Sequence, residues 1–286
     1  MLPPSFAFPL PKSQSPLPAQ ALPYPQIRRI QAKPVVKRIV TKVQLNQALI
    51  AEAYRRNAAH VAELLAQGAN PNAFDKAGVP VLFYAVAVKD NLTVITLLLG
   101  KGANVNAQDP RGNTVLAEAV QLKADPIALL LLQRKADPNV RNGAGFTPLG
   151  IATAENAPAT MHLLLAHGAD PNAAQRGSVT PLVMAVSRGN PEAVRLLVEA
   201  GAVVNSGTAT SPRVSSDRIS PLSVAVASRS LRREAVLLEL LDHGADVNGR
   251  DAQNNPPLVV GDSWGGFCRS AATHSSAEVA FRRVDQ

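Results

Sequence analysis

One short phrase recurs six times along this chain, and its spacing limits the folds that the chain can adopt. The phrase places a pair of aliphatic residues before a glycine or its substitute and closes on an asparagine, as in Leu64 to Asn72. The closing asparagines lie 34, 33, 33, 33 and 43 residues apart, at Asn72, Asn106, Asn139, Asn172, Asn205 and Asn248. A fixed period of about 20 to 50 residues is typical of a stacked array, in which each unit buries its apolar face only against its neighbours. The repeat therefore predicts a modular array rather than a closed globule.

A second phrase follows the first at a constant offset. It reads FTPLGIA from Phe146 to Ala152 and VTPLVMA from Val179 to Ala185. A period of 33 that carries both phrases resembles the ankyrin repeat family, and the resemblance covers roughly Gln44 to Leu258. It implies an all-α repeat fold, an ankyrin-repeat solenoid of helix-turn-helix units with projecting β-hairpin fingers.

Each unit carries its own signals for where its helices begin and end. Threonine can cap free amides at a helix start, and proline fits the first helical position because the donor that it lacks is not needed there. The glycine of the first phrase stands where a helix ends in a left-handed residue, at Gly68, Gly102, Gly168, Gly201 and Gly244. Lys135 replaces that glycine in one unit. We expect that unit to be looser, because the substitution costs about 1 kcal/mol.

The ends of the chain depart from the repeat. Residues 1–40 hold nine prolines, and residues 1–51 hold seven lysines and arginines but no acid, whereas the remainder has 22 bases and 21 acids. We predict a disordered, Pro-rich basic tail over residues 1–40, a repeat domain over 41–258 and an irregular C-terminal tail over 259–286. An enlarged finger is predicted near Ser206 to Ser216, because Pro221 follows Asn205 by 16 positions where the other units use nine.

The sequence offers no constellation for catalysis or metal binding. The single cysteine, Cys268, excludes an internal disulfide and any cysteine metal cluster. Its neighbour His274 could act as a base, but this segment lacks a packed scaffold. His167 and His243 each precede a helix-ending glycine, where a ring can meet free carbonyls. The repeated asparagines are predicted to satisfy backbone groups in the tight bend between units. We therefore expect no enzyme activity, no cofactor, no metal and no small-molecule substrate.

The positions that vary between units indicate where binding occurs. The resemblance implies that a partner docks on the concave face formed by the finger tips and first helices. The candidate partner-binding residues are Phe74, Lys76, Val79, Gln108, Arg111, Asn113, Gln121, Leu122, Arg141, Phe146, Glu155, Gln175, Arg176, Ser187 and Arg188. Phenylalanine and arginine are enriched at interface hot spots. We predict a monomeric, non-enzymatic scaffold that binds another protein through this face.

One departure from the family pattern concerns the contacts between units. The family's histidine after the TPL phrase is absent throughout, since the residues in its place are Phe83, Ala117, Gly150, Val183 and Ser223. The hydrogen bonds that this histidine makes between units must be missing or replaced.

The basic tail leaves several alternatives open. Residues 1–51 resemble the export leaders of bacterial effector proteins, which would send the chain from the cytoplasm into a host cell. An organellar transit peptide is also Arg-rich and acid-poor, although the early prolines argue against its amphipathic helix, and an ordinary disordered extension fits equally well. The alternative function is nucleic-acid or anionic-membrane association through Arg28, Arg29, Lys33, Lys37 and Arg38. A cytoplasmic location is otherwise expected, and no apolar stretch is long enough to span a membrane.

Overall fold

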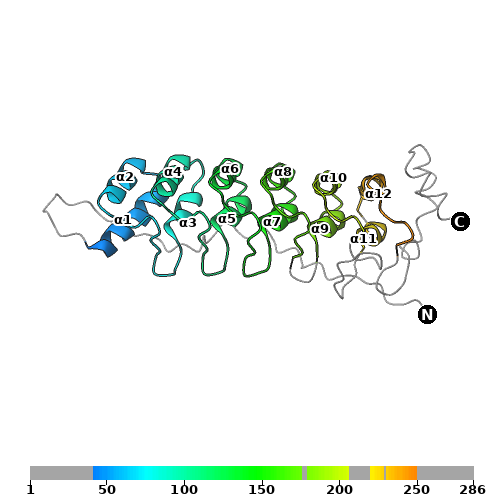
Figure 1. Cartoon of the computed structure of the whole chain (residues 1–286), viewed down its shortest axis with the longest axis horizontal. Helices are drawn as coiled ribbons and strands as arrows, with labels where there is room; N and C mark the ends of the chain where they lie inside the picture. The colour runs from blue at the N-terminus through cyan, green and yellow to red at the C-terminus, as the bar shows by residue number, and fades with distance from the viewer. Residues whose placement is uncertain (1–40, 176–178, 206–219, 229, 250–286) are drawn as a thin grey trace. The chain divides into compact units, whose positions relative to one another are not determined.

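Twelve α-helices in six consecutive pairs make up the described part of the chain (Figure 1). The computed structural model describes residues 41–175, 179–205, 220–228 and 230–249. The first helices of the pairs are α1 (Lys42–Tyr54), α3 (Val81–Val86), α5 (Val115–Gln121), α7 (Pro148–Ala154), α9 (Pro181–Ser187) and α11 (Pro221–Ala227). The second helices are α2 (Ala58–Ala66), α4 (Leu92–Gly100), α6 (Asp125–Gln133), α8 (Pro158–Ala166), α10 (Pro191–Glu199) and α12 (Arg233–Asp242). The predicted tails and the enlarged finger lie outside the described residues, and the predicted repeat domain is described only as far as residue 249.

The helices form two parallel rows of neighbours. Each first helix packs on its own partner and on the first helices of adjacent units, and the second helices pack in the same way (Figure 1). The leucines of the second phrase lie in this core, each at most 1% exposed, at Leu82, Leu116, Leu149, Leu182 and Leu222. The alanines three positions later are equally buried, at Ala85, Ala119, Ala152, Ala185 and Ala225. An alternation of leucine with a small side chain lets thin helices stack closely, and the predicted all-α repeat is confirmed.

The predicted helix starts are confirmed where threonine is present. The hydroxyls of Thr114, Thr147 and Thr180 each accept a hydrogen bond from the amide three residues on, at 3.1, 3.1 and 3.3 Å. Pro80 stands at this position before α3 and supplies no side-chain cap. Thr41 caps α1 in the same way, with a bond of 3.3 Å from the Gln44 amide, so threonine fixes the start of four of the first helices by a purely local contact.

Left-handed residues end both helices of a unit. After the second helix, the predicted glycines have φ values between 82° and 92°, and Lys135 takes the same conformation with φ of 68°. A second set, which the sequence signals did not reveal in full, lies between the two helices of each of the first five units, at Arg56, Asp90, Lys123, Asn156 and Gly189. Arginine and lysine rarely adopt positive φ, so the stacking of the units must impose that backbone.

Lys135 offers a direct test of the cost of this geometry. A left-handed conformation costs a side-chain-bearing residue about 1–2 kcal/mol, and the greater freedom of glycine in the unfolded chain returns about 0.4–1 kcal/mol of that. We expect Lys135→Gly to raise the free energy of unfolding by about 0.5–1 kcal/mol in urea denaturation. The matched control is Lys101→Gly, because Lys101 has a φ of −98° and gains nothing from glycine. Equal effects at both positions would contradict the explanation.

The repeated asparagines join each unit to the next, which extends the predicted structural role. The side chain of Asn139 donates from Nδ2 to the carbonyl oxygen of Gly168 at 3.0 Å and accepts at Oδ1 from the amide of Asp170 at 2.8 Å. The same pair of bonds recurs from Asn72, Asn172 and Asn205. These asparagines therefore satisfy the helix-ending bend of the following unit rather than their own.

Candidate functional site

Three rigid loops, here called fingers 1, 2 and 3, project below the first helices (Figure 1). They comprise residues 74–80, 108–114 and 141–147. In each finger one carboxylate or amide oxygen, from Asp75, Asp109 or Asn142, accepts hydrogen bonds from two backbone amides at 2.8 to 3.1 Å. The predicted hairpins are reduced to isolated β-bridges, Phe74 with Pro80 and Gln108 with Thr114, so side-chain bonds hold these fingers more than strand pairing does.

Fingers 2 and 3 are bonded directly to each other. The amide of Gly143 donates to the carbonyl oxygen of Arg111 at 2.9 Å, and Asn142 Nδ2 donates to Asn113 Oδ1 at 3.0 Å. A Cβ atom added at Gly143 would lie 2.5 Å from the Arg111 carbonyl oxygen. Glycine is therefore required here by the close approach of two backbones, and the two fingers form one continuous edge.

Most of the predicted partner-binding residues lie at the surface. The exposed ones are Phe74, Lys76, Gln108, Arg111, Gln121, Arg141, Glu155, Ser187 and Arg188. Asn113, Leu122 and Phe146 are half-buried, and Arg176 lies outside the described residues. Several are already engaged within the array, because Glu155 pairs with Lys123 at 3.5 Å and Arg141 donates to the carbonyl oxygen of Ala174. The exposed members belong to the fingers, to the first helices or to the residues that directly follow those helices.

Two predicted surface residues are buried, and treating them as surface positions was wrong. Val79 is 9% exposed, and its backbone closes finger 1 on Asp75 with bonds of 2.9 and 3.0 Å. Gln175 is 4% exposed and its amide bonds to Thr147 and to the carbonyl oxygen of Ala173. The sequence pattern placed both on the fingers but carried no signal for the direction of their side chains.

Gln175 replaces the missing histidine of the preceding unit. Its Oε1 accepts from the Thr147 amide at 3.0 Å, and its Nε2 donates to the Thr147 hydroxyl at 3.3 Å and to the Ala173 carbonyl at 2.8 Å. Gly150 stands where the family has histidine, and a Cβ there would lie 2.5 Å from the Gln175 amide. The hydrogen bonds that the histidine would make are thus supplied by a side chain of the following unit, and the absence of a side chain at Gly150 leaves the space for it.

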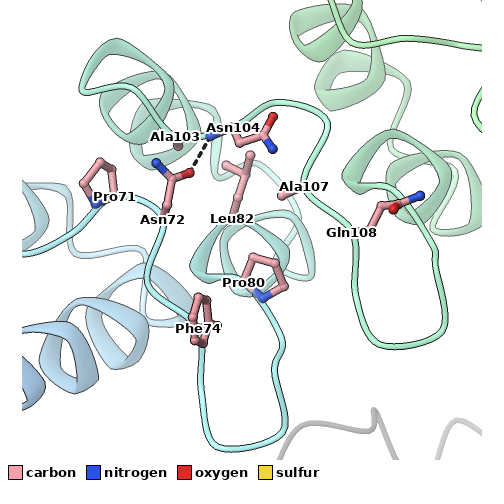
Figure 2. A pocket seen from close by; sticks show the side chains of 9 residues that line it. All are labelled: Pro71, Asn72, Phe74, Pro80, Leu82, Ala103, Asn104, Ala107 and Gln108. Atoms are coloured by element: carbon pink, nitrogen blue, oxygen red, sulfur yellow. Dashed lines mark hydrogen bonds between the residues drawn. The ribbon is translucent and has the colours of Figure 1, made fainter.

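A pocket of about 450 Å³ opens between the stems of fingers 1 and 2 (Figure 2). It is lined by Pro71, Asn72, Phe74, Pro80, Leu82, Ala103, Asn104, Ala107 and Gln108. Phe74 is 69% exposed although it is a large apolar side chain. Among the lining residues, only Phe74 and Gln108 were predicted from the sequence to bind a partner. The other walls belong to the repeated scaffold phrases of two adjacent units, and the repeat pattern alone does not show that a hollow lies between them.

One carboxyl on the first-helix side, that of Glu118, lies in surroundings that disfavour its ionised form. Burial raises the pKa of Glu118, the nearby carboxylate of Asp109 raises it further, and Arg111 opposes both effects. A carboxyl whose pKa is raised by folding adds stability below its unfolded pKa, and that stability is lost as the pH rises through the folded pKa. The ionised form of Glu118 therefore destabilises the array near neutral pH.

The raised pKa of Glu118 predicts how the effect of Glu118→Gln on stability depends on pH. We expect Glu118→Gln to raise the urea midpoint near neutral pH. The gain is expected to vanish below about pH 4, where the Glu118 carboxyl is protonated in both the folded and the unfolded chain. Exposed Glu63 provides the control variant Glu63→Gln. A gain that persists unchanged at acid pH would exclude relief of an ionised carboxyl as the cause.

The histidines of the array have the structural role predicted for them. The Nδ1 atoms of His167 and His243 lie 2.9 and 2.8 Å from the carbonyl oxygens of Leu163 and Glu239, so each ring meets the end of its own helix. Within the described ranges, no three histidine, cysteine, aspartate or glutamate side chains gather as metal ligands would. Cys268 and His274 lie outside those ranges. None of the helices described is long and apolar enough to span a bilayer.

Comparison with known families settles what kind of array this is. The family model described as ankyrin repeats, in three copies, matches residues 49–142, 82–175 and 149–251. Together the matches run from residue 49 to residue 251, well over half of the chain. The chain is an ankyrin repeat protein. Ankyrin repeats generally serve as protein–protein interaction modules and are typically not enzymes. No curated protein matches this ankyrin repeat chain with significance.

Proposed function

We propose that this ankyrin repeat protein is a non-enzymatic scaffold that binds a partner protein through fingers 1 to 3 and the adjoining first helices. The observation that carries the proposal is the hydrogen bonding that holds the fingers beneath their exposed side chains. Each finger is fixed by its own carboxylate or amide, and fingers 2 and 3 are bonded together. A preorganised surface loses little conformational entropy when a partner binds, so more of the contact energy appears as affinity.

The exposed side chains on this rigid base are of the types that dominate binding energy. Phe74 projects from finger 1, and Arg111 from finger 2. Aromatic and arginine side chains are over-represented among residues whose truncation weakens complexes most. Buried Val79 and Gln175 take no part in the proposed surface, and their role is to hold the fingers and the adjoining units in place.

The proposal is tested with single substitutions in the full chain. Partners captured by affinity purification are identified, and the complex is then titrated with purified components. We expect Phe74→Ala and Arg111→Ala each to weaken binding about tenfold or more, with unchanged helical content by circular dichroism. The control is Arg195→Ala, at an exposed position on α10 among the second helices.

Three results would count against the finger surface. Equal weakening by the α10 control would place the interface on the second helices. Loss of helical content in the finger variants would show that Phe74 and Arg111 act in folding. Retained affinity in both finger variants would likewise exclude this surface as the interface.

Delivery of the chain to another cell is a separate proposal, and it depends on the composition of residues 1–51 alone. Those residues combine nine prolines with seven bases and no acid, as export leaders of bacterial effector proteins do. Fusion of residues 1–51 to a reporter, followed by a translocation assay, tests this role. A reporter that stays in the producing cell removes the effector-type proposal and leaves the scaffold function unaffected.

A further inference from the structure

Fingers 2 and 3 meet at an Asn-Gly pair, Asn142 and Gly143, which is a chemically reactive sequence. We propose that Asn142 is a deamidation site, that the contact with finger 2 keeps it intact in the folded protein, and that its conversion to aspartate breaks the side-chain bond between the two fingers. This inference goes beyond the scaffold function and does not depend on it. It is carried by the hydrogen-bond donors and acceptors that surround the pair.

Deamidation of an Asn-Gly pair is a reaction of the chain with itself and then with water. The Gly143 nitrogen, having lost its proton to hydroxide, attacks Cγ of Asn142 and closes a cyclic imide. The bond from Cγ to Nδ2 breaks, and the departing nitrogen takes up a proton from water and leaves as ammonia. A water molecule then opens the imide at either carbonyl and leaves aspartate or isoaspartate. Glycine allows this attack most readily, because it has no side chain to obstruct it.

The contact between the fingers requires both residues of the reactive pair. A Cβ atom at Gly143 would lie 2.5 Å from a carbonyl oxygen of finger 2, so glycine is the residue that fits there. An amide is required at Asn142 because its Nδ2 donates to Asn113 Oδ1 at 3.0 Å. The corresponding residues of fingers 1 and 2, Asp75 and Asp109, have no such donor. The reactive pair is therefore a consequence of the way in which fingers 2 and 3 meet.

A carboxylate fixes the orientation of the amides at this contact. Asp109 when ionised only accepts hydrogen bonds, so the Asn113 group 3.0 Å from its Oδ2 must be the Nδ2 donor. Asn113 therefore presents Oδ1 to finger 3, where it accepts from Asn142 Nδ2. Asn142 Oδ1 then accepts from the amides of Ala144 and Phe146, at 3.1 and 2.9 Å. Each member of this chain of bonds has one orientation that satisfies it.

The same bonds oppose deamidation in the folded protein. The Gly143 amide donates to the carbonyl oxygen of Arg111 at 2.9 Å, so its proton is held in place. The Asn142 side chain makes three bonds, and Cγ can turn toward the Gly143 nitrogen only when they break. Gly143 is exposed, so water and hydroxide reach the site. The protection is therefore conformational, and it is lost when fingers 2 and 3 separate locally.

Aspartate at position 142 would preserve finger 3 but lose its side-chain bond to finger 2. Asp75 and Asp109 each accept two backbone bonds in their own fingers, as Asn142 does, so aspartate fits within the finger. Its second oxygen would face Asn113 Oδ1, and two acceptors repel each other. Turning the Asn113 amide over gives no relief, because its Nδ2 would then leave the Asp109 carboxylate. Deamidation thus weakens the edge that the two fingers form.

The reaction is followed in the full-length protein, incubated at mildly alkaline pH with and without urea. Peptide mass spectrometry detects the mass increase that accompanies replacement of an amide by a carboxylate. We expect deamidation at Asn142 to be at least about tenfold slower in the folded protein than in urea. Asn113→Ala is expected to accelerate it about threefold or more in the folded protein and to leave the urea rate unchanged. The other Asn-Gly pair, Asn248 and Gly249, is the internal reference and is expected not to respond to Asn113→Ala.

A second variant tests the consequence of the modification without waiting for the reaction. In Asn142→Asp we expect the Gly143 amide to exchange its hydrogen faster, because finger 2 is released. The amides of Ala144 and Phe146 are expected to keep their protection, since aspartate still accepts from them. The control variant is Gln133→Ala, at an exposed position on α6 of the unit that contains Asn113, and it is expected to change neither reaction nor exchange.

Four results would overturn the inference. Equal rates at Asn142 in the folded and the unfolded chain would show that finger 2 gives no protection. Acceleration by Asn113→Ala at Asn142 and Asn248 alike would show a general loosening of the array. Absence of reaction at Asn142 even in urea would show that it is not a deamidation site. Unchanged exchange of the Gly143 amide in Asn142→Asp would show that the side-chain bond does not hold the fingers together. The scaffold function is judged separately, by the partner titration described above.

Discussion

Replacing Gln175 with alanine is expected to lower the free energy of unfolding by about 2–3 kcal/mol. The change removes three hydrogen bonds at a site that is 4% exposed, and it leaves the Thr147 amide and the Ala173 carbonyl without their buried partner. A buried donor or acceptor that loses its partner costs about 1–3 kcal/mol. Urea denaturation followed by circular dichroism measures the change. Gln121→Ala, at an exposed position on α5, is the matched control and is expected to change little.

A double-mutant cycle separates this contact from a general loss of packing. Gly150→Ala alone is expected to destabilise the protein, because its new Cβ would lie 2.5 Å from the Gln175 amide and would displace it. In the Gln175→Ala background the amide is absent, so the same substitution is expected to cost much less. Additive effects of the two changes would contradict a direct contact between these positions.

Gly143→Ala is expected to lower the free energy of unfolding by about 1–3 kcal/mol and to separate fingers 2 and 3. The new Cβ would lie 2.5 Å from the Arg111 carbonyl oxygen, and a backbone atom cannot rotate away as the end of a side chain can. The bond from the Gly143 amide to that oxygen would be lost as well. Denaturation measures the stability, and amide hydrogen exchange in residues 109–113 and 142–146 reports on the contact between the fingers.

The control for this substitution is Gly100→Ala at the end of α4. A Cβ there meets nothing within 4 Å, so alanine is expected to be neutral or mildly stabilising through its higher helix propensity. If Gly143→Ala proves as harmless as Gly100→Ala, the fingers yield easily and rigidity does not support the proposed binding surface. Faster exchange confined to the two fingers is the result expected of a rigid, coupled edge.

The sequence predicted what local chemistry determines. Threonine caps and left-handed glycines act within a few residues, so the helix bounds and the period could be found without coordinates. The role of His167 at its helix end was predictable for the same reason. Each of these features depends on neighbours in the sequence, and a repeat shows the same features in every unit.

What the sequence did not predict depends on the adjacent unit. Lys123 adopts positive φ between its helices although no local signal favours it there. The burial of Gln175 depends on the space that Gly150 leaves in the preceding unit. The pocket beside Phe74 forms from two units and is absent from either alone. The absent family histidine did indicate a missing or substituted bond, but it could not indicate which residue supplies the substitute.

The asparagine bonds and the Gln175 contact differ in how far they restrict the order of the units along the chain. The asparagine bonds reach only main-chain atoms, so any unit with the same bend can follow any other. The Gln175 amide fits only against a residue without a side chain. The unit that contains Gln175 can therefore follow only the unit that contains Gly150. Duplication of a unit elsewhere in the array keeps every asparagine bond, whereas exchange of the unit that contains Gly150 breaks a matched pair. The contact between Gln175 and Gly150 thus fixes the order of these two units, whereas the asparagine bonds place no such restriction on which unit follows.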